Sequence, residues 1–97
     1  MTNNSENTPR VIDSDHARLV VDSGGVVAAT LKNENGAWVL QLQTGKGGFL
    51  TLGKAKEKNQ VRTWADLARA AAYARERLKI GTVKLEMENW QPKQRAI

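Results

Sequence analysis

Apolar and polar residues alternate with a period of two through the middle of the chain, a pattern typical of half-buried β-strands. Residues 26–32 and 37–43 each place three apolar side chains on one side, namely Val27, Ala29 and Leu31, then Trp38, Leu40 and Leu42. The turn sequences NENG and TGKGG separate these segments from each other and from a shorter apolar segment at 49–53. The pattern predicts an antiparallel meander of these segments, preceded by a weaker strand at 19–21.

A helical period replaces this alternation between Thr63 and Leu78. Thr63 is a residue type preferred at the N-cap, and Asp66 follows three residues later, where a carboxylate reaches back to a free N–H group. Apolar residues then gather on one side of the predicted helix: Trp64, Leu67, Ala68, Ala71, Ala74 and Leu78. Gly81 is the predicted helix stop, and alternation at 82–88 predicts a last strand.

These elements follow the order ββββαβ. They predict an α+β fold in which an antiparallel sheet of three to five strands has one amphipathic helix packed on one face. A chain of 97 residues is too short for a second core, so residues 17–90 are predicted to form a single domain. Residues 1–16 are polar without a periodic apolar face and are expected to form a flexible N-terminal arm. Residues 91–97 are expected to form a polar, basic tail.

Composition excludes several classes of site. The chain has no cysteine and one histidine, His16, which excludes disulfide frameworks, thiolate zinc sites, cysteine nucleophiles and His-rich metal sites. His16 lies near Asp13 and Asp15, but this cluster lacks the turn glycine and terminal Glu of a calcium loop and is interpreted as a polar lead-in segment. No catalytic set emerges, so we expect neither enzymatic activity nor a cofactor nor a metal. No apolar run approaches the roughly 20 residues that span a bilayer, which favours a cytoplasmic protein without membrane contact.

The distribution of charge is more informative than the total of +5. Between the turn at 44–48 and the helix, five basic residues stand against Glu57 alone, which leaves +4 in this stretch: Lys46, Lys54, Lys56, Lys58 and Arg62. On the predicted helix, Arg69, Tyr73 and Arg77 form a stripe at i, i+4 and i+8. Basic groups so placed suit contacts with phosphates, although a solvated helix face has the same appearance.

A single helix covers only one face of the predicted sheet and leaves the other open. Five polar side chains are expected to project from that open face: Thr30, Lys32, Gln41, Gln43 and Thr51. These residue types hydrogen-bond base edges and phosphates, and an antiparallel sheet of two or three strands fits a major groove. Val39 and Phe49 are expected as exposed apolar side chains on the same face, which suits a contact surface. Sheets that only face water also display Gln and Thr.

The stretch from Gly36 to Leu78 resembles the small arm-type, AP2-like DNA-binding domains of phage and transposon integrases. The resemblance rests on the strand NGAWVLQLQ, a short strand ending Leu52-Gly53, and the Thr-led helix TWADLARAAAYARERL. It implies three antiparallel strands lying in the major groove with the helix packed behind them. By position, it implies groove and backbone contacts by Gln41, Gln43, Lys46, Thr51 and Lys54. The chain ends without a recombinase catalytic domain, which favours an accessory or regulatory protein of a mobile element.

These observations predict a small, non-catalytic protein that binds nucleic acid, with double-stranded DNA favoured, through the open sheet face and the basic stretch. An alternative is a small interaction module, an adaptor or inhibitor, that docks an acidic protein partner on the same surface or at an edge strand. A homodimer is a further alternative if residues 83–88 or 19–21 lie at a sheet edge.

Overall fold

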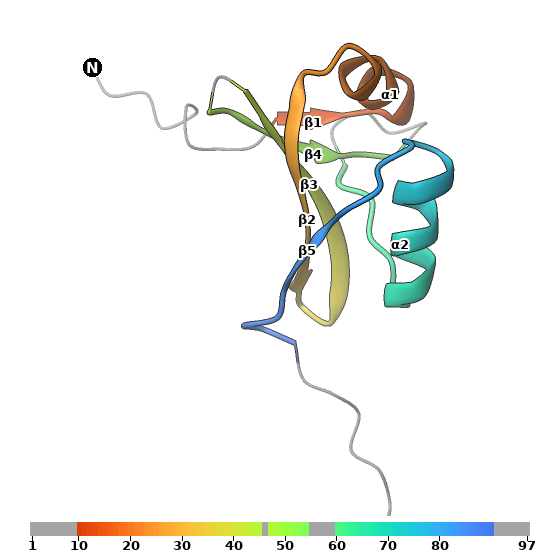
Figure 1. Ribbon diagram of the computed structural model, residues 1–97. Coiled ribbons are helices and arrows are strands. Elements are labelled where there is room, and N and C mark those ends of the chain that lie inside the picture. The colour runs from red at the N-terminus through yellow and green to blue at the C-terminus, as the bar shows by residue number, and fades with distance from the viewer. Residues whose placement is uncertain (1–9, 46, 55–59, 91–97) are drawn as a thin grey trace, which may run out of the picture.

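The computed structural model describes residues 10–45, 47–54 and 60–90 (Figure 1). Within these ranges the strands are β1 (Arg10–Ile12), β2 (Val26–Glu34), β3 (Ala37–Thr44), β4 (Phe49–Leu52) and β5 (Lys84–Glu86). The helices are α1 (Ser14–Asp22), between β1 and β2, and α2 (Leu67–Glu76), between β4 and β5. Neither of these helices has the length and apolar character needed to cross a membrane.

The strands form one mixed sheet in the spatial order β1-β4-β3-β2-β5. β2, β3 and β4 make the antiparallel meander that the alternation predicts, whereas the outer strands β1 and β5 pair in parallel with β4 and β2. The turn between β2 and β3 fixes their register, because Asn35 and Gly36 both have positive φ values, 55° and 83°. Such a two-residue turn matches the twist of the flanking strands. Glu34 therefore pairs with Ala37, and the sheet's alternation follows from that pair.

Both helices lie on the same side of the sheet, and the core fills the space between them and β2, β3 and β4 (Figure 1). Ala17 of α1 and Ala70 and Ala74 of α2 are buried, which allows the helix backbones to approach the sheet closely. Five leucines are the largest fully buried side chains: Leu31, Leu40, Leu42, Leu52 and Leu78. Each contributes roughly 1.5–3 kcal/mol of apolar burial.

The predicted α+β class and the antiparallel central strands are confirmed, but the sheet as a whole is mixed rather than antiparallel, and it is accompanied by two helices rather than one. The order differs from ββββαβ because residues 19–21, predicted as a strand, lie in α1. Asp13 begins this helix: its Oδ1 accepts the backbone N–H of His16 at 2.8 Å and it has extended backbone angles. Arg18 and Asp22 then form an ion pair at i, i+4. The N-cap and the ion pair favour a helix, and this preference prevails over the strand preference of the β-branched Val20 and Val21.

The N-terminal arm predicted for residues 1–16 lies only partly within the described ranges. Residues 10–12 form β1 and residues 14–16 begin α1, while residues 1–9 lie outside the description. The predicted tail at 91–97 also lies outside it.

The helix predicted between Thr63 and Leu78 corresponds to α2, but α2 begins and ends at other residues than predicted. Asp66, not Thr63, is the N-cap, and its carboxylate accepts the N–H of Ala68 at 2.9 Å. Trp64 precedes the helix and pairs with Trp38 as an isolated bridge. The C-terminal end is closed by Lys79, which adopts a left-handed φ of 62°, and by the N–H of Ile80, which donates to Ala74. Lysine here adopts a conformation in which glycine is usual, and the helix ends before Gly81, which is therefore not the stop.

Candidate nucleic-acid interface

The sheet face turned away from α1 and α2 carries no helix among the described residues (Figure 1). Strand register aligns five side chains on this open face in a single row across the sheet. The row runs β5, β2, β3, β4, β1 and consists of Lys84, Thr30, Gln41, Thr51 and Val11. Four of these side chains carry hydrogen-bonding groups, so the middle of the open face is polar.

Two shorter rows flank the central one. Towards the β2–β3 turn, register aligns Glu86, Lys32 and Val39. Towards the β3–β4 turn, it aligns Ala28, Gln43 and Phe49, and Phe49 is exposed. The open face therefore grades from charged at one end to mixed polar and aromatic at the other.

Two side chains of the open face are more buried than the sequence pattern predicts. Val39 is only 5% exposed and Thr51 only 8%, although the alternation predicts that both project into solvent. Both lie on inner strands of the sheet, β3 and β4, and are more buried than Gln41 and Gln43 on the same face. Val27 is 62% exposed instead, because a register shift between Val26 and Ala28 leaves it unpaired with β3.

Lys32 lies close to two carboxylates. Its Nζ is 3.7 Å from Oε1 of Glu86 on β5 and 3.9 Å from Oε2 of Glu34 on its own strand. Both glutamates are about half exposed, so these pairs contribute little to stability. They nevertheless offset the positive charge of Lys32 in its flanking row, and the cation of the central row is Lys84.

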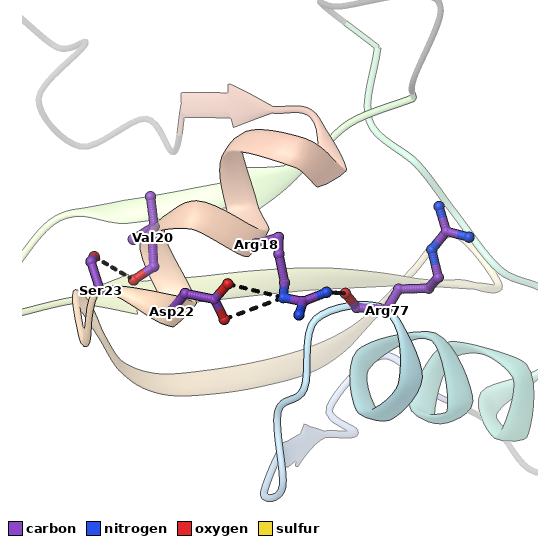
Figure 2. Close-up of polar contacts among 5 residues, drawn as sticks. All are labelled: Arg18, Val20, Asp22, Ser23 and Arg77. Atoms are coloured by element: carbon purple, nitrogen blue, oxygen red, sulfur yellow. Dashed lines mark hydrogen bonds and ion pairs between the residues drawn. The ribbon is translucent and has the colours of Figure 1, made fainter.

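The helix-borne residues predicted as contacts lie on the other side of the sheet. The side chain of Arg69 on α2 is 83% exposed, and its Nε lies 4.0 Å from Oδ2 of Asp66. Tyr73 packs against the core. Arg77 caps the end of α2, where its carbonyl accepts a hydrogen bond from Nη1 of Arg18 at 3.3 Å. Figure 2 shows that the Arg77 side chain points away from this contact, while Arg18 also reaches Asp22. Arg18 thus ties α1 to the end of α2.

Arg62 also lies on the helix side. Its guanidinium carbon is 4.7 Å from the ring centroid of Tyr73 and 5.1 Å from that of Trp64. The two rings are themselves in contact, with centroids 5.2 Å apart. Cation–π attraction therefore holds Arg62 over the aromatic pair, a structural role that its place in a basic stretch does not reveal.

Of the remaining basic residues predicted as contacts, Lys54 lies within the described ranges. Lys54 is exposed directly after β4, and its Nζ lies 3.2 Å from Oε1 of Gln60. Lys46, Lys56 and Lys58 lie outside the described residues.

The structure therefore divides the predicted contacts into two sets. Lys32, Gln41, Gln43 and Thr51 share the open face, whereas Arg62, Arg69, Tyr73 and Arg77 lie on the helix side. Sequence reasoning does not select Lys84, which completes the central row. Alternation at 82–88 indicates its side of a strand, but only the parallel pairing of β5 with β2 shows which face that is.

The His16 cluster has a local role. Oδ1 of Asp13 lies 2.9 Å from Nδ1 of His16 as well as accepting the N–H of that residue, so this contact belongs to the N-cap of α1. Within residues 10–45, 47–54 and 60–90, no three His, Cys, Asp or Glu side chains are grouped so as to hold a metal ion.

Comparison of the whole chain with protein-family models, curated proteins and solved structures found no match. The case for a function therefore rests on the residues of this chain and their arrangement.

Proposed function

We propose that the protein is a non-catalytic nucleic-acid-binding module that applies its open face to double-stranded DNA. The observation that carries the proposal is the central row, in which Thr30, Gln41 and Thr51 lie side by side on three antiparallel strands with Lys84 beyond them. The arrangement that the resemblance implies, three antiparallel strands with a helix behind, is present as β2, β3, β4 and α2.

The dimensions of the sheet suit a major groove. Neighbouring strands lie about 4.8 Å apart, so the backbones that carry Thr30 and Thr51 are separated by about 10 Å. A B-DNA major groove is about 12 Å wide and admits elements of this size. β5 lies one strand farther out, which brings Lys84 to the rim of the groove, where phosphates lie.

The residues of the central row differ in the contacts that their side chains can make with DNA. The Gln41 side chain both donates and accepts hydrogen bonds through one planar amide, the group that reads adenine edges. Lys84 would act as a point charge on the backbone, and the formal charge of +5 on the chain favours approach to a polyanion. Because Thr51 is mostly buried, we assign it the support of Gln41 rather than a direct base contact.

A pair of charge changes on opposite sides of the sheet tests this proposal. Gln41→Glu introduces one negative charge in the middle of the open face, whereas Arg69→Glu changes the charge by two units on the helix side. We expect Gln41→Glu to weaken binding of a labelled mixed-sequence duplex by roughly tenfold or more, from lost hydrogen bonding and phosphate repulsion. Arg69→Glu, screened across the domain, should change affinity by less than about threefold at physiological salt.

Fluorescence anisotropy at stepped salt concentrations provides the measurement, and circular dichroism confirms that both variants fold. Absence of wild-type binding at low salt would exclude the proposal, since counterion release favours even non-specific complexes there. A larger loss of affinity for Arg69→Glu than for Gln41→Glu would indicate that DNA contacts α2 rather than the open face.

The alternative, docking of an acidic protein partner, is favoured by the exposed aromatic ring of Phe49 on the open face. Capture of partners from cell extract with and without nuclease separates the two functions. Partners lost after nuclease treatment support nucleic-acid binding, and a stoichiometric protein that persists supports the alternative.

A further inference from the structure

β5 is an outer strand whose far edge has no strand partner among the described residues. It pairs with β2 only through Lys84, Leu85 and Glu86, and all three residues are exposed. Alternate backbone groups of a strand point to opposite edges, so part of the hydrogen-bonding capacity of β5 points away from β2. Such an edge is a template for pairing with another strand unless it is protected.

The charges of β5 are complementary to a second copy of β5 in one orientation. If two copies pair antiparallel about Leu85, Lys84 of each copy lies opposite Glu86 of the other. Parallel pairing in register would instead oppose like charges. The other outer strand, β1, does not share this property, because the same operation about Val11 sets Arg10 against Ile12.

The opposite side of β5 is apolar and matches the same register. Leu85 pairs with the buried Leu31 and therefore lies on the helix side of the sheet, where it is still 43% exposed. Antiparallel pairing about Leu85 brings the two Leu85 side chains together and sets Met87, which is 49% exposed, opposite Val83 of the second copy. The pairing thus removes exposed apolar surface while it satisfies charges on the open face.

We propose that two copies of the chain associate through antiparallel β5 strands, related by a two-fold axis at Leu85. In this dimer Glu86 lies between Lys32 of its own chain, at 3.7 Å, and Lys84 of the second copy. The two sheets join edge to edge, with both open faces on the same side. The inference does not require the proposed function, since it concerns only the edge of the sheet.

Charge exchange at β5 gives a specific test. Lys84→Glu makes each strand acidic at both positions, and Glu86→Lys makes each strand basic at both. Each variant alone should be monomeric, with a mass of 10.7 kDa, at concentrations where the wild type has twice that mass. An equimolar mixture should recover the doubled mass, because an acidic strand is complementary to a basic one. The double variant Lys84→Glu with Glu86→Lys should also dimerise.

Sedimentation equilibrium measures these masses, and circular dichroism shows whether each variant is folded. Arg69→Glu and Glu76→Lys are matched controls, since they make the same charge changes on exposed positions of α2 and should leave the wild-type dimer intact. A wild type that stays monomeric up to millimolar concentration overturns the proposal. So does a mixture of the two single variants that remains monomeric while both are folded.

Discussion

Gly53 occupies a place where the sheet leaves no room for a side chain. It follows β4 and is buried, its N–H donates to Ile12 at 2.7 Å, and it forms an isolated bridge with Val61. A Cβ atom added here would overlap Cγ1 of Val11 and would lie 3.0 Å from the carbonyl oxygen of Gln60. Gly53→Ala therefore probes whether β1 packs against the end of β4.

The expected loss of stability is set by these neighbours. The carbonyl oxygen belongs to the backbone, and Val11 is β-branched and stiff at χ1, so neither yields easily. Overpacking of this kind costs about 1–3 kcal/mol. Gly81→Ala is the matched control, because an added Cβ there meets nothing within 4 Å and its φ is not in the left-handed region. It should be neutral or stabilising by up to about 1 kcal/mol.

Urea unfolding followed by the fluorescence of the buried Trp38 and Trp64 measures both effects. With a slope near 1 kcal/mol/M for a small domain, Gly53→Ala should lower the midpoint by about 1–3 M. Val11→Ala removes the overlapping methyl group, so in that background Gly53→Ala should cost about 1 kcal/mol less. Equal midpoints for Gly53→Ala and Gly81→Ala, or no rescue by Val11→Ala, would refute the packing of β1 on Gly53.

Three further substitutions test local contacts by the same unfolding assay. Arg62→Ala should cost about 1–2 kcal/mol because it removes cation–π contacts with two rings, whereas Arg69→Ala, 83% exposed, should stay within about 0.5 kcal/mol. Asp66→Ala should cost about 1 kcal/mol through loss of the N-cap of α2. Asp66→Asn should keep most of the wild-type stability, because asparagine is also a preferred N-cap residue. Lys79→Gly should raise stability by up to about 1 kcal/mol, because glycine adopts the left-handed φ of 62° without strain; a loss of stability would contradict the left-handed conformation of Lys79.

The sequence predicts best what is determined locally. β2, β3 and their turn follow from a period of two and from Asn35-Gly36, whose conformations fix the register within a few residues. The open-face positions of Lys32, Gln41 and Gln43 follow from that register. Burial on the open face is not predictable in this way, because Val39 and Gln41 lie on the same face of β3, yet Val39 is buried and Gln41 is only partly buried.

Long-range pairing accounts for most of the differences. β1 and β5 are short and pair in parallel with strands that are distant in sequence. Parallel strands are not joined by a tight turn, so no turn sequence indicates which strand each one pairs with. The side of the sheet taken by Arg62, Arg69 and Arg77 likewise depends on where α2 packs, and this separates them from the open face. Asp13 is of a residue type that ligates metals, whereas its spacing to His16 is that of an N-cap.

The side-chain amide signals of Gln41 and Gln43 give the most direct test of the proposed interface. In a ¹⁵N-labelled sample titrated with a mixed-sequence DNA duplex at low salt, these signals and the backbone amides of Thr30 and Lys84 should shift together. The backbone amides of Arg69 and Arg77, on the other side of the sheet, should stay in place. Shifts confined to α2, or a spectrum unchanged by DNA, would contradict the assignment of the open face as a nucleic-acid interface.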